Sequence, residues 1–127
     1  MKRLVLILAL ILSVFLVTAC GSTLASQKIT PKAYVTDYVE QATSHILVDV
    51  RTPQEYAEGH IAGSINIPLQ ELASRMNEIP MDIPAIIYCR SGNRSAQAMK
   101  ILADAGYTNI YDLGGIIQWT QAGYSLQ

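Results

Sequence analysis

Cys89 opens a short polar stretch whose residue types and spacing suggest covalent chemistry. Residues 89–95 read Cys-Arg-Ser-Gly-Asn-Arg-Ser and follow an apolar, strand-like run at 85–88. A cysteine at a strand end is either a small buried hydrophobe or a nucleophile around which the loop is built. The residues that follow it bear on this choice.

The loop after Cys89 has the composition of an anion site. A helical pattern begins near Ser95, which we interpret as a capping serine, so the positive end of a helix dipole would face the loop. Successive backbone N–H groups would form a nest that favours the thiolate over the thiol. Arg90 and Arg94 add positive charge, and Gly92 allows a tight curl. The pattern predicts a reactive Cys89.

The N-terminus has the pattern of an export signal. Lys2 and Arg3 precede an apolar run of 14 residues at 4–17, which is shorter than the roughly 18 residues expected of a membrane-spanning helix. Residues 17–20, Val-Thr-Ala-Cys, resemble the lipobox of bacterial lipoproteins. That resemblance implies cleavage before Cys20 and acylation of its thiol and new amino group. An ordinary signal peptide with a chance cysteine, or an uncleaved anchor, remains the alternative.

These features predict three segments. Residues 1–19 would be a lipoprotein signal peptide, residues 20–28 a lipidated cysteine with a small, polar tether, and residues 29–127 one domain. Cleavage would leave 108 of the 127 residues, with seven basic and ten acidic side chains. This mildly acidic chain has no basic run, which argues against a nucleic-acid partner. We expect an exported protein, anchored by lipid to the bacterial cell envelope membrane on its periplasmic or extracytoplasmic face.

Cysteine usage supports a working thiol. The chain has two cysteines, and acylation of Cys20 would leave Cys89 unpaired in an exported protein, where cysteines normally form disulfides. An odd thiol in that setting is a candidate reactive group. Without the lipobox, a disulfide between Cys20 and Cys89 is the competing possibility.

The remaining chain alternates short apolar strands with helices, which predicts an α/β fold with a small parallel sheet covered on both faces. Ligands of such folds bind at the carboxyl ends of the strands, where Cys89 lies. We expect helices over 30–42, 52–59, 69–79, 95–105 and 116–120, strands over 46–50, 64–67, 85–88 and 109–113, and a Gly114-Gly115 turn.

Three separated motifs resemble rhodanese-like domains, in the order of that family. Residues 46–68, ILVDVRTPQEYAEGHIAGSINIP, resemble the entry segment, residues 89–95 the active-site loop, and residues 113–124, LGGIIQWTQAGY, the closing segment. The likeness covers nearly the whole chain from about Lys28 onward. It implies a rhodanese-like fold and a sulfurtransferase without cofactor or metal.

The resemblance assigns roles by residue. Cys89 would take a sulfane sulfur from a donor such as thiosulfate, hold it as a persulfide, and pass it to a thiophilic acceptor such as cyanide or a thiol. Backbone amides would cradle the persulfide, while Arg94, and less surely Arg90, would hold the anionic donor. The loop residues concerned are Arg90, Ser91, Gly92, Asn93, Arg94 and Ser95.

Other functions remain open beside this one. Phosphatases of this fold use a Cys-x5-Arg loop, but Arg94 follows Cys89 after four residues and Ser95 occupies the phosphatase position. Rhodanese folds also serve as non-enzymatic binding modules, although such copies commonly lack the cysteine. The persulfide could also be exchanged with a thiol of another envelope protein.

Further residues support the loop or complete the core. Asp49 and Arg51 flank Val50 at another strand end, and the resemblance suggests that they organise the floor of the site. The alternative is a surface ion pair of little energetic value. Trp119 is expected to anchor the core. Neither histidine, His45 nor His60, is expected to serve Cys89 as a base.

Overall fold

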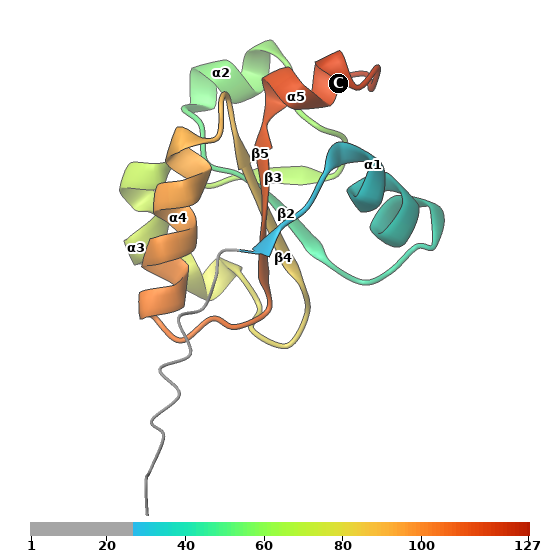
Figure 1. Ribbon diagram of the computed structural model, residues 1–127. Coiled ribbons are helices and arrows are strands. Elements are labelled where there is room, and N and C mark those ends of the chain that lie inside the picture. Colours follow the sequence, from blue (N-terminus) through green and yellow to red (C-terminus); the bar gives the residue numbers. More distant parts are fainter. Residues whose placement is uncertain (1–26) are drawn as a thin grey trace, which may run out of the picture.

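The computed structural model describes residues 27–127, and in it five parallel strands form one sheet (Figure 1). The strand order is β1-β5-β4-β2-β3, so the carboxyl ends of all strands meet at one edge. This confirms the predicted parallel sheet. The strands are β1 (Gln27–Lys28), β2 (Ile46–Asp49), β3 (Ser64–Asn66), β4 (Ala85–Cys89) and β5 (Ile110–Gly115).

Helices cover both faces of the sheet, as predicted. Figure 1 shows α3 and α4 on one face and α1 on the other, with α2 and α5 near the carboxyl ends of the strands. The α-helices are α1 (Pro31–Tyr34), α2 (Pro53–Glu58), α3 (Leu72–Arg75), α4 (Asn93–Asp104) and α5 (Ile116–Gln121). A π-helix, η1 (Val35–Glu40), continues α1, and the 3₁₀ turns η2 (Leu69–Glu71) and η3 (Met76–Glu78) flank α3.

Two hydrophobic clusters sandwich the central strand β4, all five residues of which are buried. Successive side chains of a strand point to opposite faces, so neighbouring isoleucines enter different clusters. Ile87 belongs to the cluster with Leu102 of α4, and Ile86 to the cluster with Trp119 of α5. Cys89 thus ends a strand that is fixed from both sides.

Some boundaries differ from those expected from the sequence. Gln27 and Lys28, placed by sequence in the tether, form β1 and pair with β5. The expected turn at Gly114-Gly115 is wrong, because both glycines belong to β5. Helix α4 begins at Asn93 rather than Ser95.

The predicted signal peptide, Cys20 and most of the tether lie outside the described residues. Within residues 27–127, no helix has the length and apolar character needed to cross a membrane.

Candidate active site

Cys89 lies at the carboxyl end of β4, where the chain curls around its sulfur. Its side chain is 1% exposed and is a free thiol within the described residues. The backbone N–H of Gly92 donates a hydrogen bond to Cys89 Sγ over 3.0 Å. Gly92 has φ of 101°, in the left-handed region that glycine adopts without strain. The loop therefore directs a backbone donor at the thiol.

The twelve-residue helix α4 begins directly after this turn. Its first hydrogen bond runs from the N–H of Ala96 to the carbonyl oxygen of Gly92, over 3.2 Å. The N–H groups at 93–95 precede that bond and have no partner in the helix, as at any helix start. Together with Gly92 they form the amide-rich, positive end of the helix dipole beside Cys89, and among these amides the one that donates to Sγ is that of Gly92.

Ser95 lies in the first turn of α4 and is fully buried, so the expectation that it caps the helix is wrong. Its Oγ lies 3.7 Å from Cys89 Sγ. The hydroxyl donates to the carbonyl oxygen of Gly92 over 3.1 Å, with that of Gly114 a second acceptor at 3.4 Å. Ser95 is thus a hydroxyl held against the sulfur, able to accept from a thiol or donate to a thiolate.

The closing segment packs directly on the loop through Gly115, a contact that the sequence did not reveal. A Cβ atom at Gly115 would lie 2.3 Å from the carbonyl oxygen of Arg90, so only glycine allows this approach. The N–H of Ile117 donates to the same oxygen over 3.3 Å. Gly115 is also the residue of β5 that pairs with Cys89. The start of α5 therefore fixes the first residue after the thiol.

Arg94 is the loop arginine with a defined partner. Its guanidinium binds both carboxylate oxygens of Glu55 from α2, over 2.7 and 2.8 Å. The hydrogen bonds from Arg94 are the main cause that lowers the pKa of Glu55 to about 2. Sequence reasoning missed Glu55, although Thr52-x-x-Glu55 is the signature of the capping box that the structure contains.

The other predicted loop residues lie at the rim. Arg90, Ser91 and Asn93 are exposed. The side-chain oxygen of Asn93 accepts from Gln97 over 3.3 Å, which turns it along the helix surface. No side chain within residues 27–127 pairs with the guanidinium of Arg90. It is the loop cation open to a ligand.

Asp49 and Arg51 form a buried ion pair at the end of β2, so the surface alternative is wrong. Their closest atoms lie 2.6 Å apart, and Arg51 also donates to the carbonyl oxygen of Gly59 over 2.7 Å. The side-chain amide of Asn66 binds the carbonyl oxygens of both residues. Burial alone would lower the pKa of Arg51, but the hydrogen bonds and charge of Asp49 raise it. The pair ties β2, β3 and the end of α2 together, and none of its hydrogen bonds reaches Cys89.

Neither histidine serves Cys89. His60 stacks on Tyr56 and contacts its carbonyl oxygen over 3.0 Å. His45 lies 2.7 Å from the carbonyl oxygen of Thr43 through Nδ1, which therefore carries a proton. Within residues 27–127 no three His, Cys, Asp or Glu side chains are grouped to hold a metal.

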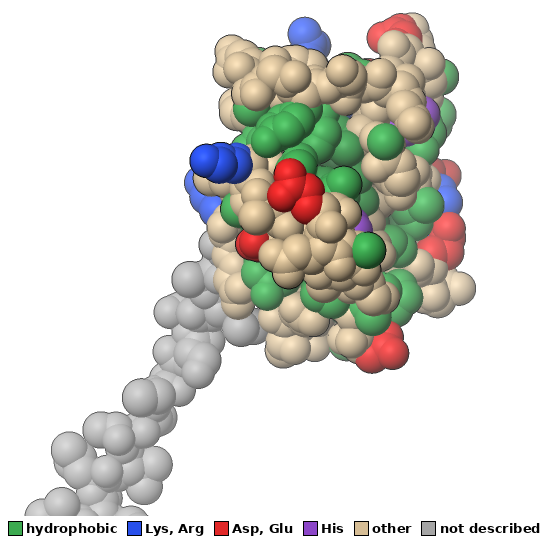
Figure 2. Space-filling model, turned by 90° about the vertical axis from the view of Figure 1, so that its right-hand side faces the viewer, with side chains coloured by type: hydrophobic (Ala, Val, Ile, Leu, Met, Phe, Trp, Pro, Cys, Tyr) green, Lys and Arg blue, Asp and Glu red, His purple; other side chains and the backbone are tan. Residues whose placement is uncertain are grey.

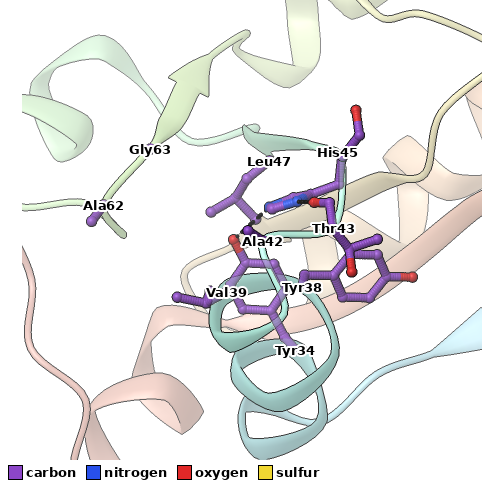
Figure 3. A pocket seen from close by; sticks show the side chains of 10 residues that line it. Tyr34, Tyr38, Val39, Ala42, Thr43, His45, Leu47, Ala62 and Gly63 are labelled. Carbon is purple, nitrogen blue, oxygen red and sulfur yellow. Dashed lines mark hydrogen bonds between the residues drawn. The ribbon is translucent and has the colours of Figure 1, made fainter.

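A cavity of about 410 Å³ lies on the α1 side, apart from the loop. Figure 3 shows the rings of Tyr34, Tyr38 and His45 gathered along it. The hydroxyl of Tyr34 lies 3.0 Å from Nε2 of His45, and burial raises the pKa of Tyr34 to about 12. Seen from this side, hydrophobic side chains gather near the middle of the face, among polar side chains and backbone (Figure 2). The cavity contains no residue of the 89–95 loop.

A solved structure and two curated relatives are similar to this chain. A rhodanese-related protein from Thermoplasma volcanium superposes with a TM-score of 0.69 and 32% identity, over 80% of this chain and 97% of that one. A sulfurtransferase of Allochromatium vinosum is 47% identical over 79 residues, 61% of this chain and 74% of the relative. Thiosulfate sulfurtransferase PspE of Escherichia coli is 39% identical over 71 residues, 54% of this chain and 68% of the relative.

The family assignment rests on the match to a model of the whole domain, and the similarity to these relatives supports it. The model of the rhodanese-like domain matches residues 32–122, most of the part of the chain that the structure describes. Its span includes β2 to α5, and with them the Cys89 loop, the Asp49–Arg51 pair and the contact at Gly115. The chain belongs to the rhodanese-like domain family.

Proposed function

We propose that this protein is a sulfurtransferase that carries a sulfane sulfur on Cys89. The observation that carries the proposal is the 3.0 Å hydrogen bond from the N–H of Gly92 to Cys89 Sγ, at the start of a twelve-residue helix. Such donors stabilise a sulfur anion, both as thiolate and as persulfide. Relatives named sulfurtransferase and thiosulfate sulfurtransferase support the same chemistry.

The reaction proceeds in two balanced displacements. The thiolate of Cys89 attacks the outer sulfur of a donor such as thiosulfate, the S–S bond of the donor breaks, and sulfite leaves with the electron pair. An acceptor such as cyanide or a thiolate then attacks the outer sulfur of the persulfide. The S–S bond to Cys89 breaks and the enzyme thiolate returns. Neither step consumes an oxidant, a metal or a cofactor.

The loop residues have distinct parts in this scheme. The amide of Gly92 and the amides at 93–95 hold the persulfide anion. The hydroxyl of Ser95 can donate a further hydrogen bond to the sulfur anion. Arg90 is exposed at the rim and attracts the anionic donor. Within the described residues, the sulfur contacts the N–H of Gly92 and the hydroxyl of Ser95, and no side-chain base reaches it.

Mass spectrometry and a turnover assay test the proposal. The full-length protein in detergent should gain about 32 Da on Cys89 after incubation with thiosulfate, the mass of one sulfur atom. With cyanide it should form thiocyanate, and Cys89→Ser should abolish both signals. Gln97→Ala is the control, because Gln97 is exposed on α4 outside the 89–95 loop and should leave both signals intact.

Two other outcomes would redirect the assignment. A wild-type protein that gains no sulfur and is indistinguishable from Cys89→Ser would be a binding module. Release of phosphate from an aryl phosphate would instead favour the phosphatase, although Arg94 is occupied by Glu55 rather than facing a phosphate site.

The location of the protein is part of the proposal. The basic start, the short apolar run and Val-Thr-Ala-Cys at 17–20 support export and lipid attachment at Cys20. A Cys20→Ala variant should then leave the membrane fraction and lose the mass of the acyl chains. Retention of that variant in the membrane would count against the anchor.

A further inference from the structure

The contact between Arg94 and Glu55 changes the charge that a donor meets at the loop. Glu55 comes from α2, and its two oxygens match the two terminal nitrogens of Arg94. One of these oxygens also accepts from the backbone N–H and the hydroxyl of Thr52. The carboxylate is therefore held by its own helix end while it holds the arginine.

This bidentate pairing occupies both terminal nitrogens of the guanidinium, which an anionic substrate would otherwise bind. It also cancels the charge of Arg94, since Glu55 is ionised at neutral pH. Arg90 then supplies the uncompensated side-chain charge of the loop, beside the amides around Cys89. The loop presents about one positive charge where its sequence alone suggests two.

We propose that Glu55 is a specificity-determining residue that, by holding Arg94, favours sulfur donors with one negative charge over dianions. The proposal deepens the sulfurtransferase function above and rests on it. Glu55 acts through Arg94 and touches neither the sulfur nor the donor, so it is a positioning residue. The preferred donors are monoanions such as thiosulfonates and organic persulfides, with thiosulfate as a weaker, dianionic donor.

The chemistry with a monoanion balances in the same way. With methanethiosulfonate, the Cys89 thiolate attacks the terminal sulfur, the S–S bond breaks, and methanesulfinate leaves with the electron pair. The enzyme keeps the sulfur as a persulfide anion. Methanethiosulfonate differs from thiosulfate by a methyl group in place of one charged oxygen, so the two donors compare charge at similar size.

Steady-state kinetics with these two donors provide the first test. Glu55→Gln keeps an acceptor oxygen for Arg94 but removes the carboxylate charge. We expect kcat/KM for thiosulfate, relative to methanethiosulfonate, to rise about threefold through KM, because the uncompensated charge of Arg94 would attract the additional negative charge of thiosulfate through largely aqueous surroundings. Glu58→Gln is the matched control, because Glu58 lies on the same helix, binds Gln54 and should leave the ratio unchanged.

Alkylation of Cys89 provides a second test that needs no turnover. Iodoacetate is an anion and iodoacetamide is neutral, so their rate ratio reports the local potential at the thiol. Glu55→Gln should raise this ratio about threefold. Adding Arg94→Gln should return it to the wild-type value, because the pair is then neutral again. Thermal unfolding of each variant confirms that it is folded.

The outcomes separate the two proposals. If no sulfur is transferred by any variant, the sulfurtransferase function fails, while the alkylation ratio still reports on Glu55. An unchanged ratio in a folded Glu55→Gln protein, or an equal rise in Glu58→Gln, would overturn the specificity role and leave the sulfurtransferase function untouched.

Discussion

Two arginine–carboxylate pairs lie near the carboxyl edge of the sheet, and they differ in their contact with water. In the Asp49–Arg51 pair the side chains are 0% and 6% exposed, and the two residues are two positions apart in sequence. In the Glu55–Arg94 pair they are 25% and 28% exposed, and the partners are 39 residues apart. The first joins strand ends, and the second joins a helix to the reactive loop.

The difference in exposure separates the energetic roles of the two pairs. A buried charge that loses its partner has no water to replace it, so breaking the inner pair is costly. If the outer pair is broken, water can hydrogen-bond to both charged groups, so the pair contributes little to the free energy of folding. Its effect lies instead in the charge near Cys89. The inner pair is thus a structural element, and the outer pair adjusts reactivity.

Removing one partner of the inner pair should have the largest effect on stability. Asp49→Ala leaves the guanidinium of Arg51 buried without its carboxylate, and we expect the free energy of unfolding to fall by about 3–5 kcal/mol. Urea unfolding followed by circular dichroism measures this loss. A loss below about 1 kcal/mol would mean that both pairs behave alike.

Replacing both partners of the inner pair should be less harmful than removing one. In Asp49→Leu/Arg51→Met no charge remains buried, and apolar side chains of similar size fill the space. The double variant should recover about 2 kcal/mol of the loss in Asp49→Ala. Recovery should stay incomplete, because the carbonyl oxygen of Gly59 loses its donor. A double variant less stable than Asp49→Ala would contradict this account of the pair.

The outer pair should contribute a small stability that depends on pH. Glu55 has a folded-state pKa lowered from 4.5 to about 2, mainly by hydrogen bonds from Arg94. A lowered pKa stabilises the fold above the unfolded value, and this contribution is lost as the pH falls through the folded value. Glu55→Gln should therefore cost under about 1 kcal/mol at pH 7.

The pH series separates charge from hydrogen bonding in the outer pair. The stability gap between wild type and Glu55→Gln should be constant above about pH 5 and close between pH 4.5 and about 2. Urea titrations at several pH values give this profile. A gap that persists below pH 2 would show that the effect comes from something other than the carboxylate charge.

A third ion pair should have the smallest effect. Arg75 binds Glu71 and Glu78 at the surface, with side chains 35%, 53% and 41% exposed. Arg75→Gln should leave the urea midpoint unchanged within error, because water replaces the lost contacts. If Arg75→Gln shifted the urea midpoint as much as Glu55→Gln does, the exposure of an ion pair would not predict its contribution to stability.

Much of the fold and the reactive loop was predictable from the sequence. The apolar run before Cys89 marks a buried strand, and the glycine and arginines after it mark the turn. These signals are local, because each depends on neighbours in the chain. The same holds for helix α2, whose start is encoded by Thr52, Pro53 and Glu55.

The contacts missed from the sequence join distant segments. In the sequence, Glu55 has the position of a helix-capping residue. No residue near it in the chain indicates that it binds an arginine of the Cys89 loop. The Gly114-Gly115 pair is typical of a turn. In the structure the pairing of β4 with β5 shifts by one residue between Ile87 and Tyr88, so that both glycines still pair with β4 as part of strand β5. Strand β1 escaped notice because two exposed polar residues give no periodic signal.

The short strand β1 shows at which end of the sheet the described chain begins. Gln27 pairs with Tyr111 of β5, whereas Cys89 pairs with Gly115, four positions or about 13 Å further along the same strand. Since all strands are parallel, the polypeptide enters the sheet at the edge opposite the thiol. A protein tethered through Cys20, as we propose, would hold its sulfur-carrying loop outward from the lipid, toward donors and acceptors dissolved in the surrounding water.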